Sequence, residues 1–138
     1  MRCIKPLLFL LFAFLLSQCK VNQFKHGERE GKWKHVDTIN NVIYQSTGRY
    51  KKGIEQKTWK QFAGKKLVRK EKYRNGICFT QYYHNNGKVS SEGKSKMIVS
   101  ENEIHWFYFD AWKFYDENGT LIGTNIYQDG TLIETIEN

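Results

Sequence analysis

A short mark recurs along this 138-residue chain and limits what the chain can fold into: a tyrosine followed three positions later by a glycine. The first and second copies lie 23 residues apart, and the second and third 54, twice 27. A second mark, an aromatic residue six positions after a glycine, shares that period. Two marks with one period indicate a repeat of short structural units. The tyrosine marks are Tyr50–Gly53, Tyr73–Gly76 and Tyr127–Gly130; the aromatic marks are Gly27–Trp33, Gly53–Trp59 and Gly76–Tyr82.

Each unit contains a turn signal. Asn-Gly occurs at residues 75–76, 86–87 and 118–119, and Asp-Gly at 129–130. Such pairs tolerate positive φ angles and join twisted antiparallel strands in hairpins. Residues 121 to 128 divide into two alternating sets, 121, 123, 125 and 127 on one side and 122, 124, 126 and 128 on the other. No segment after residue 20 shows sustained helical spacing. The sequence therefore predicts an all-β fold of repeated β-hairpins.

The segment Gly27-Glu-Arg-Glu-Gly-Lys-Trp33, with the tyrosine marks and the aromatic-rich strands before Asn-Gly, resembles the MORN-repeat family. More narrowly, it is similar to the degenerate bacterial variant of that repeat, which is common in exported and lipid-anchored proteins. The match spans residues 27 to 130. The resemblance implies one elongated antiparallel sheet of successive hairpins with aromatic side chains along one face. Single hairpins are marginal in water, so Trp33, Trp59, Tyr82 and Trp112 are expected to pack between neighbouring units.

The first residues carry an export signal. Arg2 and Lys5 precede a run of ten residues, 7 to 16, that contains only Leu, Phe and Ala. A membrane-spanning helix needs about 20 apolar residues, whereas ten after a basic start are typical of a signal peptide. We therefore expect a helical signal peptide at residues 1–18.

The run ends in Leu16-Ser17-Gln18-Cys19, which resembles a bacterial lipobox, although Gln18 stands where Gly, Ala or Ser is usual. The resemblance implies lipidation of Cys19: diacylglycerol on the sulfur and an acyl group on the new amino terminus, which together hold the protein to a membrane. Ordinary cleavage after Cys19, which would give a soluble exported protein, is the alternative. Residues 19–26 would form the lipid anchor and a short linker, and residues 27–138 the repeat domain of about four units. The segment after Cys19 begins with Lys20 and has no acidic cluster, which favours a periplasm-facing position.

Charge is distributed unevenly. Residues 49–74 hold eleven basic and two acidic side chains, whereas residues 101–138 hold eight acidic and one basic. The basic segment is interpreted either as a solvated strand face, where Lys discourages edge pairing, or as a surface for an anionic membrane or an acidic protein partner. An exported protein would rarely meet nucleic acid, so we expect no nucleic-acid partner. The candidate binding residues in this segment are Lys65, Lys66, Arg69 and Lys70.

An insertion near residues 97–110 precedes the fourth unit and contains a dense aromatic run. It is interpreted either as an extra strand with one buried face or as a partner-binding site, because aromatic residues dominate interface hot spots. The candidate residues are Trp106, Phe107 and Tyr108.

No motif in the sequence indicates catalysis or metal binding. The four histidines are scattered without metal-ligand spacing, and there is no Gly-x-Ser-x-Gly. Cys78 is expected to be a small residue of an apolar strand. We therefore expect no cofactor, no metal and no catalytic residue, and a lipid-anchored envelope protein that acts as a non-catalytic interaction scaffold. A soluble exported binding module remains an alternative, as does an antitoxin-like regulator, a label that relatives of the bacterial repeat variant carry.

Overall fold

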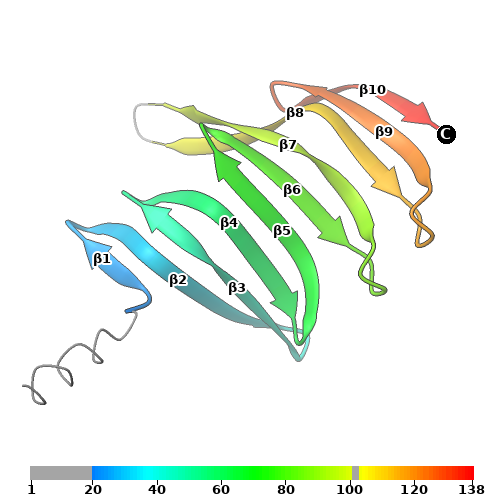
Figure 1. Ribbon diagram of the computed structural model, residues 1–138. Coiled ribbons are helices and arrows are strands. Elements are labelled where there is room, and N and C mark those ends of the chain that lie inside the picture. Colours follow the sequence, from blue (N-terminus) through cyan, green and yellow to red (C-terminus); the bar gives the residue numbers. More distant parts are fainter. Residues whose placement is uncertain (1–19, 101–102) are drawn as a thin grey trace, which may run out of the picture.

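The computed structural model describes residues 20–100 and 103–138, and every regular element in them is a β-strand (Figure 1). The strands are β1 (Gln23–Lys25), β2 (Glu28–Ile39), β3 (Val42–Lys51), β4 (Ile54–Ala63), β5 (Lys66–Arg74), β6 (Ile77–Tyr83), β7 (Val89–Val99), β8 (Ile104–Tyr115), β9 (Leu121–Gln128) and β10 (Thr131–Glu137).

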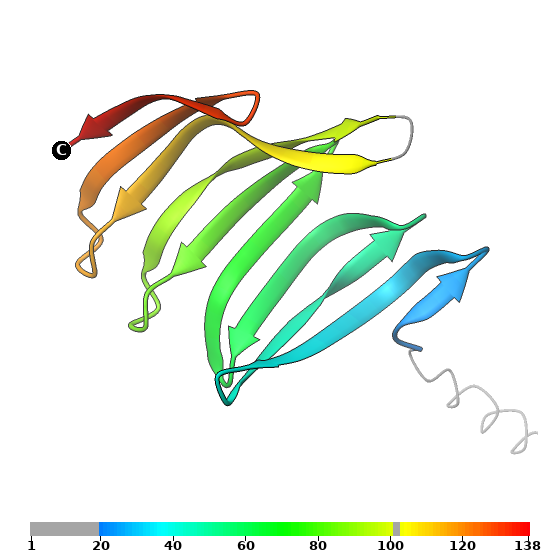
Figure 2. The same cartoon turned by 180° about the vertical axis from the view of Figure 1, so that it is seen from behind.

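The ten strands form one antiparallel sheet in which each strand pairs with its neighbours in the chain. Figures 1 and 2 show the consequence: a single twisted layer with β1 at one end and β10 at the other, and no described element stacked on either face. The all-β, hairpin-built sheet predicted from the turn signals is thereby confirmed. The expected signal helix and Cys19 lie outside the described residues. Strand β1 falls within segment 19–26, so the sheet begins before the expected domain start at Gly27.

The turns are of two kinds. Asn75-Gly76 and Asp129-Gly130 have positive φ at both residues, the geometry that two-residue hairpins favour. In the loops at 86–87 and 118–119 only the glycine has positive φ. There the hairpins close over wider loops, through hydrogen bonds such as that from the His84 amide to the Lys88 carbonyl, 2.8 Å. The Asn-Gly and Asp-Gly pairs therefore mark all four of these turns correctly but do not determine the type of turn.

Three tryptophans lie two residues after a residue with a positive φ angle, and two of these residues lie at a β-bulge. Gly31, Lys57 and Asp110 have φ angles of 75°, 60° and 64°, and each precedes a tryptophan by two positions. The pairing register shifts beside Lys57 and beside Asp110. A bulge bends its strand and redirects the side chains that follow it. Strand pairing places Trp33, Trp59 and Trp112 on one and the same face of the sheet, and the two bulges set this orientation for Trp59 and Trp112.

Burial is concentrated on this face, which we call the aromatic face. Since one sheet cannot enclose a core, large side chains cover one another across the strands instead of being surrounded. Tyr82, which the six-residue spacing equates with Trp33, is only half-buried. Gly48 faces Trp33 as Gly93 faces Thr80, so Thr80 occupies the equivalent position in β6. The buried residues are Trp33, Tyr50, Trp59, Cys78, Thr80, Ser95 and Trp112.

The insertion lengthens a hairpin. Met97 pairs with Trp106 and Val99 with Ile104, so the extra residues extend both β7 and β8. The expected additional strand is therefore wrong, because each half of the segment satisfies its backbone hydrogen bonds as part of β7 or β8.

No helix among the described residues has the length and apolar character needed to span a membrane.

Candidate interaction surfaces

The aromatic face begins as a ladder of rings at the β1 end of the sheet. The ring centroids of Trp33 and Tyr50 lie 5.5 Å apart, and those of Tyr50 and Trp59 lie 4.9 Å apart, both edge-to-face. Arg29 lies over both Trp33 and Tyr50 and donates a hydrogen bond of 3.0 Å to the Tyr50 hydroxyl. Edge-to-face pairs and cations over rings stabilise by about 1 kcal/mol each. The main role of these rings is therefore to stabilise the sheet by packing.

Each buried tryptophan is also tied to the backbone of a neighbouring strand. The indole N–H of Trp59 donates to the Arg49 carbonyl at 3.1 Å, and that of Trp112 to the Lys94 carbonyl at 2.9 Å. The residue before each acceptor is a glycine, Gly48 or Gly93, above which the indole lies. Buried indole N–H groups need such a partner. The pairing of tryptophan and glycine therefore repeats as a unit, in β3–β4 and again in β7–β8.

Between these two units the aromatic face turns polar. Glu71 lies opposite both Trp59 and Thr80, in the row that holds glycine in the flanking units. Its carboxylate is 3.6 Å from the Arg69 guanidinium. Burial raises the pKa of Glu71, and the charge of Arg69 opposes that rise only in part. A half-buried acid–base pair thus interrupts the ring ladder at the middle of the sheet.

The opposite face of the sheet is basic across β2 to β5, and we call this side of the sheet the basic face. Lys34 pairs in register with Thr47, Thr47 with Lys60, and Lys60 with Lys70. Antiparallel partners point to the same side, so these side chains form a row across four strands. The row runs along a groove of about 540 Å³, which we call the basic groove. It is lined by Val21, Lys32, Trp33, Lys34, Thr47, Gly48, Arg49, Lys57, Thr58 and Lys60.

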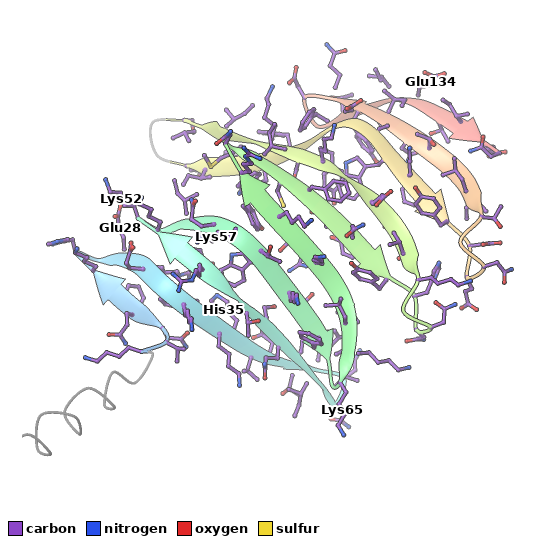
Figure 3. All side chains as sticks on the ribbon, in the orientation of Figure 1. Glu28, His35, Lys52, Lys57, Lys65 and Glu134 are labelled. Carbon is purple, nitrogen blue, oxygen red and sulfur yellow. The ribbon has the colours of Figure 1, made fainter. Side chains whose placement is uncertain are left out.

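The structure does not bring the four predicted basic residues together. Lys65 lies in the β4–β5 turn, where Figure 3 shows it at the edge of the molecule, and Lys66 begins β5 beside it. Arg69 lies on the aromatic face with Glu71, whereas Lys70 lies on the basic face. Alternation along a strand sends neighbouring residues to opposite sides. A contiguous basic run in the sequence is therefore divided between two faces and a turn.

The predicted aromatic residues are divided in the same way. Trp106 packs edge-on against Tyr73, with ring centroids 5.3 Å apart, and Tyr108 packs on Trp112 at 4.2 Å. Phe107 points to the other face, where its ring lies beside Gly130. Trp106 and Phe107 are half-buried, and Tyr108 is 42% exposed. The run is mainly packing for the long β7–β8 hairpin, with the Tyr108 ring also open to solvent.

Cys78 is buried in β6 as a free thiol 3.4 Å from the Thr80 hydroxyl, which confirms the prediction of a small residue in an apolar strand. Burial raises the pKa of this thiol. In residues 20–100 and 103–138, no group of three or more His, Cys, Asp or Glu side chains is arranged to hold a metal ion.

Sequence reasoning missed the residues of the basic groove. Lys32, Lys34 and Arg49 lie outside or at the margin of the basic segment 49–74 that drew attention. The one available signal was the alternation of Lys32 and Lys34 around Trp33, which predicts a basic side opposite the ring. That Lys60 joins them depends on the register of three strands and on the bulge at Lys57.

The far end of the sheet is acidic and exposed. All seven residues of β10 are exposed, and Figure 3 shows Glu134 at this end, away from the β1–β4 end. Leu132, Ile133 and Ile136 add apolar surface beside the acidic side chains. The molecule therefore presents a basic groove at one end and an acidic, partly apolar strand at the other.

Comparison with known proteins does not show a family for this chain. No model of a known protein family matches the chain, and no curated protein matches it. Among solved structures it is similar to a chain in a structure titled "Crystal structure of GtfA/B complex", at 11% identity and a TM-score of 0.27. The match covers 89% of this chain and 21% of that one. A similarity this weak carries no argument about function.

Proposed function

We propose that this protein is a non-catalytic interaction scaffold held at the bacterial cell envelope by acyl chains on Cys19. The observation that carries the scaffold role is the single-layer sheet, which packs aromatic side chains on one face and displays a row of basic side chains on the other. A lone sheet that orders ten strands presents a long surface relative to its mass, as repeat proteins that bind partners do. Its partner is an acidic protein surface or an anionic membrane surface.

Support for the anchor comes from the sequence. The apolar run of residues 7–16 and the lipobox-like Leu16-Ser17-Gln18-Cys19 lead directly into the sheet, which begins at Gln23. Two or more acyl chains are needed for lasting attachment, because one alone binds a membrane only marginally. Modification of Cys19 would supply them. We place the anchored sheet on the periplasmic side, since Lys20 and the residues after it include no acidic cluster.

We also propose that the repeat is of the degenerate bacterial MORN type. The regular hairpins, the Tyr-x-x-Gly turns and the residue of positive φ two positions before each buried tryptophan support a common ancestral unit. The antitoxin-like alternative requires a full-length cytosolic protein. The soluble exported alternative requires a chain that has lost its leader and carries no lipid.

Intact mass of the protein purified from its own membranes tests the anchor. The proposal expects a chain that begins at Cys19 with acyl groups, and incorporation of a labelled fatty acid that Cys19→Ala abolishes and Cys78→Ala leaves unchanged. A chain that starts after Cys19 without lipid supports the soluble exported module. A chain that retains the residues before Cys19 and partitions with the cytosol supports the antitoxin-like regulator.

A further inference from the structure

The basic groove holds positive charge with no counterpart inside it. Five of its ten lining residues are basic and none is acidic. All five are exposed, and none forms a salt bridge with another residue that the structure describes. Clustered like charges destabilise the sheet that carries them. A groove of this kind gains most from an anionic occupant. The five are Lys32, Lys34, Arg49, Lys57 and Lys60.

Strand β10 has the complementary properties. Its outer edge pairs with no other described strand, and its side chains include Glu134 and Glu137 but no basic residue. Ile133 is 57% exposed. An exposed edge strand with apolar side chains is a site where a second chain tends to add. Docking would remove these apolar side chains from water.

Charge favours docking of β10 at the basic groove over pairing of β10 with β10 of a second copy. Pairing of β10 with β10 of a second copy would place the acidic side chains of both copies along one shared edge, where no basic residue of β10 offsets them, and nearby like charges are destabilising. Docking of β10 at the basic groove brings opposite charges together instead. Residues 101–138 carry seven more acidic than basic side chains, and residues 49–74 carry nine more basic than acidic, so the longer-range field favours the same arrangement.

One copy cannot make this contact with itself. The groove is formed by β2, β3, β4 and the segment that precedes β1, whereas β10 is the last strand at the other end of a ten-stranded sheet. Six strands, β4 to β9, connect β3 to β10, and the views in Figures 1 and 2 agree that the two ends are separated by the width of the sheet. A contact between the groove and β10 must therefore join two molecules.

We propose that the basic groove of one molecule binds the acidic strand β10 of a second copy, head to tail. A contact between two different surfaces leaves a free groove at one end of the pair and a free β10 at the other, so further copies can add. The inference rests on the interaction role proposed above and gives that scaffold its partner, a second copy of this chain. It does not depend on the acyl anchor.

The test is sedimentation of the full chain, extracted in a mild detergent and carrying a fluorescent label, over a range of concentrations and at low and high salt. We expect association that rises with concentration and weakens in high salt, because salt screens exposed charges. The double variant Lys34→Glu/Lys60→Glu should weaken association about tenfold or more, and Glu134→Lys/Glu137→Lys should do the same. Mixing the two double variants should restore association. The unchanged basic groove of the β10 variant can then bind the unchanged acidic β10 of the groove variant, and the two reversed surfaces are also complementary.

A matched control is Lys65→Glu/Lys66→Glu. It changes the same amount of charge but lies in the β4–β5 turn and at the start of β5, outside the groove. It should leave association within about twofold of the original. Circular dichroism and the unfolding midpoint of each variant show whether its sheet is intact, and the mixing experiment tests the contact even if one variant is less stable.

Several results would overturn the proposal. Monomers at every concentration would do so, as would association that the groove variants leave unchanged. Stronger association of the neutral variant Glu134→Gln/Glu137→Gln than of the original protein would show that copies meet at β10 alone. If the groove variants lose binding to vesicles of anionic phospholipid while self-association is absent, the groove is a membrane site instead. The intact-mass measurement that tests lipidation of Cys19 is independent of these results. The proposed anchor and the proposed contact between copies can therefore fail separately.

Discussion

Gly48 lies directly beneath the indole ring of Trp59, so close that a Cβ atom at this position would overlap the ring. The same relationship joins Gly93 and Trp112. The two glycines are separated from their tryptophans by different numbers of residues, because the β7–β8 hairpin is longer than the β3–β4 hairpin. The contact between a large flat ring and a bare backbone is therefore the conserved geometry within this chain, and the intervening length is free to vary.

The first prediction concerns Gly48→Ala. Its φ is not in the left-handed region, so any loss of stability comes from the clash with Trp59. Overpacking of this kind costs about 1–3 kcal/mol, and displacement of the indole adds to it. Gly123→Ala is the control, because its new Cβ would meet only the Ile136 carbonyl at 3.4 Å, an ordinary contact. Urea unfolding measures both; equal effects of the two substitutions would contradict this explanation.

The second prediction concerns Trp112. Trp112→Phe keeps an aromatic ring over Gly93 but removes the hydrogen bond to the Lys94 carbonyl, and we expect a loss of about 1–2 kcal/mol in the free energy of unfolding. Trp112→Ala should lose about 3–5 kcal/mol. Trp106→Ala, at a half-buried ring, should cost less than Trp112→Ala. Thermal unfolding gives the order, and a larger effect at Trp106 would show that the long hairpin, not the glycine-backed indole, holds the sheet.

The third prediction concerns the pH dependence of stability at Glu71. Burial raises the pKa of this carboxyl, so the folded protein binds the proton more tightly than the unfolded chain does. The contribution of Glu71 to the free energy of unfolding therefore falls as pH rises from its unfolded pKa, about 4.3, to its higher folded pKa. The slope of this fall is at most about 1.4 kcal/mol per pH unit.

Glu71→Gln removes the proton from this equilibrium. The free energy of unfolding of the variant, minus that of the original protein, should rise with pH across this window and then level off. Urea unfolding at a series of pH values above 4 measures the difference. A difference that stays constant with pH would show that Glu71 titrates alike in the folded and unfolded chain.

The fourth prediction concerns the reactivity of Cys78. The thiol is buried, and burial raises its pKa, so little thiolate is present and reagents cannot reach it. We expect modification of Cys78 by a thiol reagent to be at least about a hundredfold slower in the native protein than in denaturant, since it must await local opening. Mass analysis of the peptide that contains Cys78 follows this residue alone. Equal rates in the two conditions would mean that β6 opens readily.

Much of the fold follows from local signals. The turns at Asn75-Gly76 and Asp129-Gly130 were predictable because few residue pairs tolerate positive φ, and strand character followed from alternation. The six-residue spacing equated Tyr82 with Trp33, whereas Thr80 holds the equivalent position, because spacing from the preceding glycine ignores which residue lies opposite in the neighbouring strand. The bulge at Lys57 carried no signal, since Lys rarely adopts the left-handed region, and Asp110 carried only a weak one, since Asp tolerates that region less readily than glycine does.

The candidate surfaces were predictable only in part. Composition revealed a basic region and an acidic region, but the four basic candidates were chosen for being close in sequence, and the sheet separated Arg69 from Lys70. Lys34 and Lys60 meet because two hairpins and a bulge set their register, which no property of either residue records. For the same reason Trp106 and Phe107, adjacent in the chain, lie on opposite faces.

The sequence by itself determined that this chain is a series of hairpins, because the turn residues, the alternation and the recurring tyrosine and glycine marks are local and repeat. It also determined that the two halves differ in charge. Only the tertiary structure decided which side chains share a face and which lie at an end of the sheet. The physical reason is that a one-residue shift in strand pairing moves every side chain to the other side, and that shift is set by bulges and cross-strand contacts between residues far apart in the chain.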